Sequence, residues 1–445
     1  MAEGQGTSMA KTDWRIGVAG LGTVGGGLLS FLADNPAFAP AGGSVSVAGV
    51  SARSRSRPRP FDIAKLAWFD DPVALASSPD VDLFVELIGG SDGPAKAAVE
   101  AALKLGKPVV TANKALIAEH GAELAVLAEA AGVPLLFEAA VMGGTPAVKM
   151  LREALVGEKV LAVSGILNGT CNYILTEMEG LLDHGGQLPK NAFAAVLAEA
   201  QRMGYAEADP TMDVGGFDAA HKITILAALA FGAAPNYAAA EIEGIDTIEL
   251  LDIKLARELG YRIRLVASAR RGEAGVSVRV HPTLAPHGHP LAETKGPLNA
   301  LFIEGERIGR IFVQGPGAGA GPTAAAVAAD IADVMTRAVR PVFQAPAGSL
   351  VPMAGLDAAH QVSKAYLRVL VKDQPGAIAA ISETLAEAGV SIDSFLQKPV
   401  QDAGGVPIVL TTHATRESVL RDAVARIGAL PQVLGPPKML RVAPV

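Results

Sequence analysis

The chain has 445 residues, of which 50% are hydrophobic and 19% are charged, and its formal net charge at pH 7 is -7. This composition is typical of a folded, soluble protein of roughly two to four domains and excludes a disordered or fibrous chain. The acidic balance argues against nucleic acid or an anionic membrane as a partner. The single cysteine, Cys171, excludes an internal disulfide and predicts a cytoplasmic protein.

The N-terminal third shows the pattern of a nucleotide-binding unit. Residues 1–13 have no apolar core and are predicted to be a disordered tail rather than a signal peptide. From residue 14 to 148 short apolar runs alternate with helical patterns, which predicts an α/β Rossmann domain with a doubly wound parallel sheet. Its predicted strands are 15–19, 44–50, 81–87, 108–111 and 134–138.

A glycine-rich loop follows the first predicted strand and opens a helix. It matches G-x-G-x-x-G, and its residues are Gly20, Leu21, Gly22, Thr23, Val24 and Gly25. The first glycine allows a tight turn, the second lets backbone N–H groups approach a pyrophosphate, and the third lets helix pack on strand. The helix N-terminus then favours the negative charge, so the loop is predicted to bind a dinucleotide rather than to be a plain turn.

The second predicted strand ends without the acidic residue that holds the ribose hydroxyls in NAD sites. Arg53 and its basic neighbours occupy that place instead. Arginine can bind a phosphate through two parallel hydrogen bonds, which favours NADP(H), with NAD possible and a solvated basic loop as the alternative. Three further segments could line the same cofactor site, and they contain Gly89, Lys114 and Gly319. Lys114 could equally be a solvated lysine at a helix start.

From residue 149 to 314 strands follow one another, which predicts an α+β substrate-binding and dimerisation domain. The predicted strands are 160–167, 262–269, 276–282, 300–304 and 307–314, with helices at 191–203 and 218–231. Residues 315–340 are expected to complete the Rossmann domain. The longest apolar stretch, 223–235, is too short to span a membrane and predicts a buried helix.

The densest group of reactive side chains is an acidic segment that ends in a lysine. Its carboxylates are Glu207, Asp209, Asp213 and Asp218, and Lys222 follows four residues after Asp218 on one helix face. Such pairs are often surface salt bridges. The helix that follows is too apolar to be exposed, so the pair is expected to face a polar cavity or an interface. An ammonium group at Lys222 would suit the protonation of a carbonyl that is being reduced.

The pattern from Ala200 to Lys222, which includes Gly204-Tyr205-Ala206, Asp209-Pro210, Asp213 and Gly216, resembles the signature of homoserine dehydrogenases. The resemblance implies NAD(P)H-dependent interconversion of L-aspartate 4-semialdehyde and L-homoserine, on the route to threonine and methionine. It implies Lys222 as proton donor and Lys114 as a second catalytic lysine. The substrate-binding residues would be Gly204, Glu207, Asp218, Asp213 and Thr170.

The same resemblance extends to the segment 138–146, which looks like the family's monovalent-cation loop. It implies a cation, with sodium expected, held by Glu138, Val141, Gly143 and Thr145. Two local departures from the family pattern are Cys171, where threonine is expected, and the longer spacing at 91–94.

Residues 341–361 contain several prolines and predict a linker. Residues 362–445 follow the order βαββαβ, a ferredoxin-like motif that resembles an ACT domain. The resemblance implies threonine as an inhibiting effector, with Asp373, Gly376 and Gln397 as contacts, and a homodimer or homotetramer. A dimerising module without ligand is the alternative for this unit. For the whole chain the alternatives are a different dehydrogenase and a non-catalytic regulator that senses NADP and an amino acid.

Overall fold

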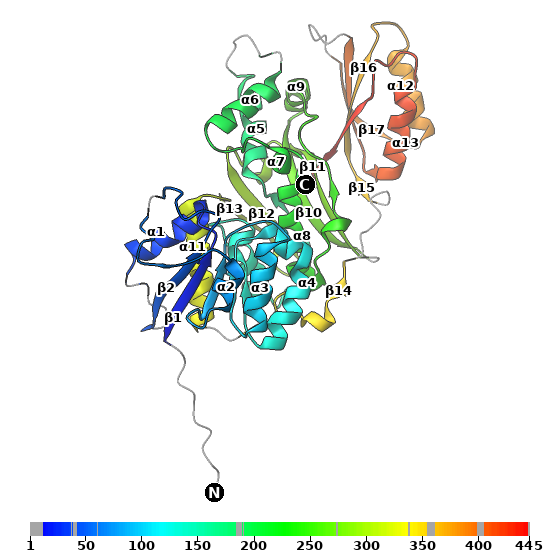
Figure 1. The fold of residues 1–445 in the computed structure, drawn as a ribbon. Helices are drawn as coiled ribbons and strands as arrows, with labels where there is room; N and C mark the ends of the chain where they lie inside the picture. The colour runs from blue at the N-terminus through cyan, green and yellow to red at the C-terminus, as the bar shows by residue number, and fades with distance from the viewer. Residues whose placement is uncertain are drawn as a thin grey trace.

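The computed structural model describes residues 12–36, 38, 42–59, 61–183, 189, 191–272, 275–336, 339–353, 361–397 and 405–443. Figure 1 shows three successive units, which run from blue through green to red. Residues 1–11 of the predicted tail and 354–360 of the predicted linker lie outside the described residues. No helix in the described ranges is long and apolar enough to cross a membrane.

The N-terminal unit is a six-stranded parallel sheet with the order β3-β2-β1-β4-β5-β6. This order confirms the predicted Rossmann fold, because the direction of winding reverses between β1 and β4. The strands are β1 (Asp13–Ala19), β2 (Ser44–Ser51), β3 (Ala67–Phe69), β4 (Leu83–Glu86), β5 (Val109–Thr111) and β6 (Leu135–Leu136). The sequence did not predict β3.

Five helices accompany this sheet: α1 (Thr23–Asp34), α2 (Pro72–Ser77), α3 (Pro94–Lys104), α4 (Lys114–Ala131) and α11 (Ala320–Thr336). The last of them comes from a distant part of the chain and packs on α1. The two helices approach so closely that a Cβ atom at Gly27 would lie 2.5 Å from the carbonyl oxygen of Ala320. The chain therefore returns to the N-terminal unit after it has built the middle one.

The middle unit is an antiparallel sheet with helices on one face, as predicted. Its strands lie in the order β13-β12-β7-β10-β11. Their bounds are β7 (Val160–Ile166), β10 (Tyr261–Gly272), β11 (Gly275–Pro286), β12 (Leu298–Gly305) and β13 (Gly309–Pro316). The other elements are α5 (Gly169–Gly180), α6 (Ala192–Arg202), α7 (Thr211–Val214), α8 (Phe217–Phe231), β8 (Ala233–Ala234), β9 (Glu241–Ile242), α9 (Leu250–Glu258) and α10 (Pro290–Glu293), with short helical turns at Glu138–Ala140, Met150–Ala154, Tyr237–Ala239 and Ala347–Ser349.

Helix α8 runs through the core of the middle unit. Every residue after Phe217 is buried, and the helix packs on β7, β10 and β11 as well as on α4 of the N-terminal unit. The predicted buried helix is confirmed. Because its apolar residues have no exposed face, the two charged residues near its start, Asp218 and Lys222, are held inside the protein at the border of the two units.

The C-terminal unit follows the predicted βαββαβ order. Its sheet order is β20-β16-β18-β17, and all its neighbouring strands are antiparallel. The elements are β16 (Ala365–Val371), α12 (Ala377–Glu387), β17 (Ile392–Gln397), β18 (Val406–Thr412), α13 (Glu417–Gly428) and β20 (Lys438–Val442). A short pair adjoins it, β15 (Val362–Ser363) with β19 (Thr415–Arg416). The segment before it forms β14 (Val351–Pro352), which pairs with β8 of the middle unit.

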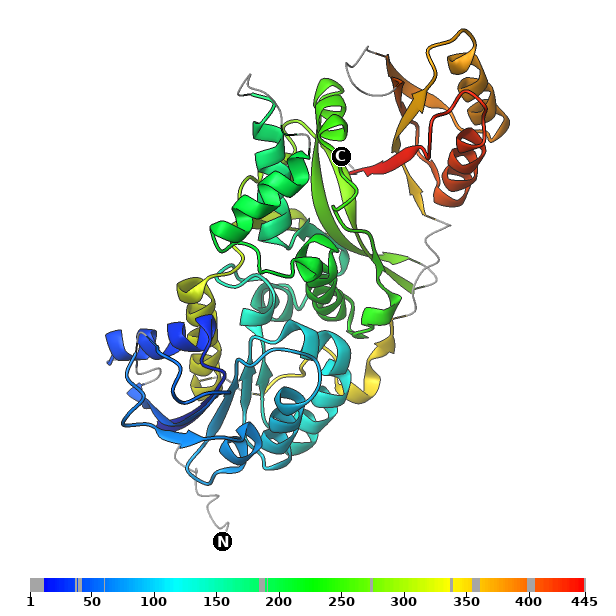
Figure 2. The same cartoon turned by 45° about the horizontal axis from the view of Figure 1, so that its top comes forward.

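One backbone ladder joins the middle and C-terminal units. β20 pairs with β11 in parallel, with Thr283 opposite Arg441 and Leu284 opposite Val442. Figure 2 shows β20, in red, between the green sheet and the rest of the C-terminal unit. The sequence pattern did not predict this continuity, because strands of one unit give no signal for the edge strand that they join in another.

Candidate active site

The glycine loop has the backbone geometry that its sequence predicts. Gly20 has a φ of +97°, and a Cβ atom there would lie 2.2 Å from the carbonyl oxygen of Leu87. A Cβ atom at Gly25 would lie 2.0 Å from the carbonyl oxygen of Gly20, whereas one at Gly22 would meet no atom within 4 Å. Helix α1 begins at Thr23 without a side-chain cap or an acidic first turn. The loop therefore offers open backbone and uncapped N–H groups to an anion.

Arg53 follows β2, and its side chain is exposed. The basic loop around it is shaped by Arg59, which the sequence argument had not singled out. The Arg59 guanidinium donates to the carbonyl oxygens of Ser54, at 2.6 Å, and Arg57, at 3.0 Å. It also lies 5.7 Å from the ring centre of Trp68, on the missed strand β3. Arg59 is thus used inside the loop, and Arg53 remains exposed for a ligand.

The carboxyl ends of β4 and β5 bring Gly89 and Lys114 to the edge of the sheet where the glycine loop lies. Gly89 has a φ of +87°, and a Cβ atom there would meet nothing within 4 Å. Lys114 is the first residue of α4, whose cap is Asn113. Since the direction of winding reverses beside β4, this edge is where a dinucleotide would bind in such a sheet.

A single carboxylate bridges the two lysines. The Lys222 ammonium group donates to Asp218 Oδ2 and to the carbonyl oxygen of Leu167, both at 2.8 Å. Lys114 Nζ lies 2.8 Å from Asp218 Oδ1. The Lys222 side chain is 10% exposed and that of Lys114 is 40% exposed. Helix α8 contributes Lys222 and Asp218 and the N-terminal unit contributes Lys114, so the cluster forms only where the two units meet.

Asn168 ties a second carboxylate to this cluster. Its side-chain amide donates to Asp213 at 2.8 Å and to Asp218 at 2.9 Å. Its own oxygen accepts from the backbone N–H of Cys171, which caps α5. Of the four predicted carboxylates, Asp213 and Asp218 are thus held together, whereas Glu207 and Asp209 are exposed.

The electrostatics of the cluster follow from burial and from the two ammonium groups. Burial alone would raise the pKa of Asp218, but Lys222 and Lys114 outweigh it and hold that pKa well below its usual value. Asp218 in turn raises the pKa of Lys114. Burial raises the pKa of Asp213. The arrangement is one stable carboxylate between two cationic groups, which suits the stabilisation of a developing alkoxide.

The remaining predicted substrate residues lie around the acidic segment with different surroundings. Gly204 lies in the turn after α6 with a φ of +78°, and a Cβ atom there would meet nothing within 4 Å. Thr170 is half-buried, and its hydroxyl donates to the carbonyl oxygen of Tyr205 at 2.7 Å. The hydroxyl of Thr170 therefore holds the acidic segment in place.

His221 is a buried neighbour of the lysines that the sequence argument missed. Its ring stacks on Tyr237, with 4.2 Å between ring centres, and its Nε2 lies 3.3 Å from a carboxylate oxygen of Glu119 on α4. Burial lowers the pKa of His221. The sequence signal for His221 was its position next to Lys222 on a helix predicted to be buried. His221 packs α8 against α4 and so supports the meeting of the two units.

In the predicted cation loop the carboxylate of Glu138 has another use. It accepts from the backbone N–H groups of Ala147, at 2.8 Å, and Lys149, at 2.6 Å. The turn packs on the loop that contains Gly319, since a Cβ atom at Gly143 would lie 2.8 Å from the carbonyl oxygen of Gly317. The Glu138 carboxylate therefore holds the start of the next helical turn.

The three predicted effector contacts lie at one end of the C-terminal sheet. Asp373 and Gly376 follow β16, and Gln397 ends β17. Because Gln397 and Val369 both pair with Ile408 of β18, the end of β17 lies level with the end of β16. Asp373, Gly376 and Gln397 are exposed.

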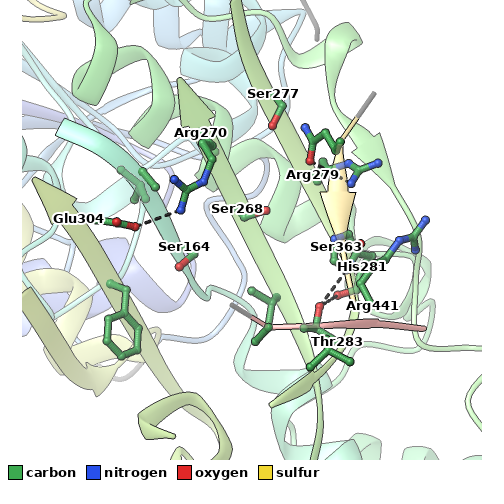
Figure 3. Close-up of a pocket in the computed structure, with 18 of the residues that line it drawn as sticks. Ser164, Ser268, Arg270, Ser277, Arg279, His281, Thr283, Glu304, Ser363 and Arg441 are labelled. Carbon is green, nitrogen blue, oxygen red and sulfur yellow. Dashed lines mark hydrogen bonds and ion pairs between the residues drawn. The ribbon is translucent and has the colours of Figure 1, made fainter. Parts of the chain in front are cut away.

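A cavity of about 730 Å³ lies on the face of the middle sheet opposite to helix α8 (Figure 3). Its labelled residues are mostly polar: Ser164, Ser268, Arg270, Ser277, Arg279, His281, Thr283, Glu304, Ser363 and Arg441. None of the predicted catalytic, cofactor or substrate residues lines it. This cavity is therefore separate from the lysine site.

Beside this cavity an ion-pair cluster crosses from the middle to the C-terminal unit. Buried Glu417 of α13 lies 2.9 Å from Arg279 of β11 and 2.6 Å from Arg441 of β20. Burial by itself would raise the pKa of Glu417, but the arginines lower it to about 2. Arg441 also pairs with Glu243. Charges as well as the backbone ladder fix the C-terminal unit on the middle one.

Comparisons with known proteins agree with this three-part arrangement. Residues 20–138 match the family model of the homoserine dehydrogenase NAD binding domain, residues 146–332 that of homoserine dehydrogenase, and residues 365–432 that of the ACT domain. The chain is 43% identical over 440 residues to the homoserine dehydrogenase of Neisseria gonorrhoeae, with 96% of this chain and 98% of that protein covered.

Solved structures are similar over most of the chain or nearly all of it. The crystal structure of a homoserine dehydrogenase from Thiobacillus denitrificans has a TM-score of 0.88 at 39% identity, with 98% of this chain and 99% of that chain covered. A hyperthermophilic archaeal homoserine dehydrogenase mutant in complex with NADPH has a TM-score of 0.63 at 27% identity, with 74% of this chain and 100% of that chain covered.

Proposed function

Because the chain belongs to the homoserine dehydrogenase family, we propose that it interconverts L-aspartate 4-semialdehyde and L-homoserine with a nicotinamide dinucleotide. The observation that carries the proposal is the Lys222, Asp218 and Lys114 cluster at the border between the nucleotide-binding unit and the buried helix α8. When bound, the cofactor supplies the hydride that reduces the aldehyde carbon.

Lys222 acts as the proton donor in this proposal. Its ammonium group has three N–H bonds, of which one points to Leu167 and one to Asp218. The third can protonate the substrate oxygen as negative charge develops on it. Lys114, held on the other oxygen of Asp218, would stabilise the same charge. In the oxidative direction Lys222 takes up the proton, so homoserine oxidation should favour alkaline pH.

The substrate carries an amino-acid group as well as an aldehyde. Exposed Glu207 can attract the ammonium group of the substrate. Asp213 and Asp218 lie in the part of the site next to Lys222. Gly204 has no side chain that would narrow the site. The Thr170 hydroxyl holds the acidic segment through its hydrogen bond to the carbonyl oxygen of Tyr205. We assign these five residues to substrate binding.

The proposed reaction is tested by the oxidation of NADPH in the presence of L-aspartate 4-semialdehyde. The absorbance of NADPH should fall on addition of the semialdehyde and stay constant with a 2-oxo acid of similar size. A rate with the 2-oxo acid alone would favour a different dehydrogenase, and NADPH binding without turnover of either compound would favour a non-catalytic regulator.

We propose that the enzyme prefers NADP(H), supported by exposed Arg53 beside the expected 2'-phosphate position. Arg53→Ala should raise the KM for NADPH about tenfold, since it removes a charged hydrogen bond to phosphate, and should leave the KM for NADH unchanged. Steady-state kinetics with both cofactors measure this. Arg257→Ala, a change of an exposed arginine on α9, is the control, and equal effects on the two cofactors would contradict the role of Arg53.

We also propose a monovalent cation, sodium, in the turn that contains Glu138, Val141, Gly143 and Thr145. The support is the resemblance of this turn to the family's cation loop. A cation there would need ligands other than the Glu138 carboxylate, which is committed to the start of the next helical turn. A cation there would stiffen the contact between this turn and the loop that contains Gly319, and it would take no part in the proton transfer.

Threonine is the proposed effector of the ACT unit, with contacts from Asp373, Gly376 and Gln397. Asp373→Ala should raise the threonine concentration for half-inhibition at least about tenfold, because the variant loses a charged partner for the threonine ammonium group. Inhibition curves at fixed semialdehyde measure this. Asp422→Ala, a change of an exposed aspartate on α13, should leave the curve as in the parent, and a shifted curve for Asp422→Ala alone would contradict the assignment.

We propose a cytoplasmic homodimer or homotetramer. The support is the sheet face that lines the cavity in Figure 3, which the helices α5 and α8 on the opposite face do not cover. A second copy of the chain would complete the layer. Light scattering should give two or four times the mass of one chain.

A further inference from the structure

A buried glutamate lies beneath the loop at the cofactor edge of the sheet. Glu86, the last residue of β4, is 0% exposed. One of its carboxylate oxygens accepts from the backbone N–H groups of Ile88, at 2.7 Å, and Gly89, at 3.1 Å. The other accepts from the hydroxyl of Thr111 on β5, at 2.5 Å. The carboxylate therefore holds the loop that leaves β4 and the end of the neighbouring strand at once.

The same hydrogen bonds continue from Thr111 to Lys114. The Thr111 hydroxyl oxygen accepts from the backbone N–H of Asn113 at 2.9 Å. The Asn113 amide donates to the carbonyl oxygen of Gly90 at 2.7 Å, and its oxygen accepts from Leu116 at 3.1 Å, which caps α4. Since Lys114 is the first residue of that helix, this closed network sets where the lysine begins its reach toward Asp218.

The charge of Glu86 needs an explanation, because a buried carboxylate without a basic partner is costly. Among the residues that the structure describes, no Lys, Arg or His forms an ion pair with Glu86. Burial raises the pKa of Glu86, and hydrogen bonds from Thr111, Gly89, Ile88 and Asn113 oppose that rise. The carboxylate is thus stabilised only by the groups that it orients.

The loop itself has space in front of it. Gly89 and Gly90 have φ angles of +87° and +85°, and Cβ atoms at these positions would meet nothing within 4 Å. Glycine is needed here for the direction of the backbone and not for close packing. Glu86 holds the loop through its backbone N–H groups. The loop has open space at Gly89 and Gly90, at the edge where the dinucleotide is proposed to bind.

We propose that Glu86 is a positioning residue for the reaction: it orients the backbone of residues 88–90 toward the nucleotide and, through Thr111 and Asn113, sets Lys114 against Asp218. The inference rests on the proposed dehydrogenase function and adds to it a residue that touches neither substrate nor cofactor. One carboxylate oxygen holds the loop and the other holds Thr111, so the position of the loop and the position of Lys114 can be tested separately.

Two substitutions distinguish these effects in the full-length protein. Thr111→Val keeps the volume but removes the hydroxyl, so kcat should fall about tenfold while the Kd for NADPH stays within about threefold. Thr111→Ser retains the hydroxyl and should keep kcat within about twofold of the parent. Glu86→Gln keeps the shape but loses the charge that holds the two N–H groups, so the Kd for NADPH should rise about tenfold and kcat should also fall.

The double variant Glu86→Gln/Thr111→Val should lose less kcat than the product of the two single losses, because both act through one network. Glu417→Gln is the matched control: it changes a glutamate of similar burial in the C-terminal unit, and its kcat and NADPH binding should equal those of the parent. Each variant is unfolded thermally, and kinetics are measured well below its midpoint.

Equal kcat for Thr111→Val and Thr111→Ser would overturn the proposal, and so would unchanged NADPH binding by Glu86→Gln. Losses that disappear when only the folded fraction is counted would show a purely structural role. Should Glu86→Gln not fold, the Thr111 pair decides the question by itself. Should the parent not reduce the semialdehyde, the proposed function has failed, and fluorescence titration of Glu86→Gln with NADPH still tests the positioning of the loop.

Discussion

Replacing Lys222 with alanine should reduce kcat for semialdehyde reduction by about 10²–10⁴, the usual contribution of a positioned proton donor. NADPH binding should remain nearly intact, because Lys222 lies on α8 of the middle unit, whereas the predicted nucleotide contacts come from the N-terminal unit. The cavity left by the side chain is closed on one side by Leu167 and Asp218. Single-turnover measurements with saturating NADPH separate the loss of chemistry from any loss of binding.

The control for Lys222 is another partly buried lysine with backbone partners. Lys107 donates to the carbonyl oxygens of Ala76 and Ser78 and lies far from Asp218 in the fold. Lys107→Ala should lose stability and keep kcat. Lys222→Met, which fills the space without a proton, should be as inactive as Lys222→Ala. Activity of Lys222→Met within tenfold of the parent would remove Lys222 from the mechanism.

Replacing Asp218 with asparagine should reduce kcat by about 10²–10³, because two cationic side chains then face each other without the carboxylate between them. The pH dependence should move as well. Asp218 raises the pKa of Lys114, so the ammonium form persists to higher pH in the parent. In Asp218→Asn that pKa falls, so Lys114 should lose the ammonium form that stabilises the developing charge at a lower pH, and the rate of semialdehyde reduction should decline at a lower pH than in the parent.

The measurement is the pH profile of semialdehyde reduction for parent and variant at saturating cofactor. Asp209→Asn is the matched control, since Asp209 belongs to the same segment but is exposed and, among the described residues, bonds only to Thr211. Its profile should overlay that of the parent. A shift of the Asp218→Asn profile to higher pH would contradict the arrangement, because the sign follows from removing a negative charge beside an ammonium group.

Local patterns predicted the parts of the site that are built within a few residues. The glycine loop was predictable because Gly20 and Gly25 meet steric requirements within one turn, while Gly22 leaves the backbone open. Asp218 and Lys222 were predictable as a pair because four residues make one helical turn. The buried character of α8 followed from its composition. These features depend on spacing along the chain, which a sequence shows directly.

Contacts between distant segments were not predictable in the same way. Nothing in the sequence places Lys114 on the second oxygen of Asp218, or Arg59 over Trp68. Glu86 did leave a signal, since an acidic residue ends an otherwise apolar strand three residues before Gly89 and Gly90. The assignments of substrate, cation and effector residues came from the family resemblance and remain predictions that the proposed variants test.

The ladder between β11 and β20 also bears on how the chain can change in length. Insertions in the segment between the middle and C-terminal units leave the pairing of Thr283 with Arg441 untouched. A single residue added just before β20 would instead turn its side chains to the opposite face and take Arg441 away from Glu417. Related proteins should therefore vary in length between the middle and C-terminal units, and they should hardly vary in length just before β20.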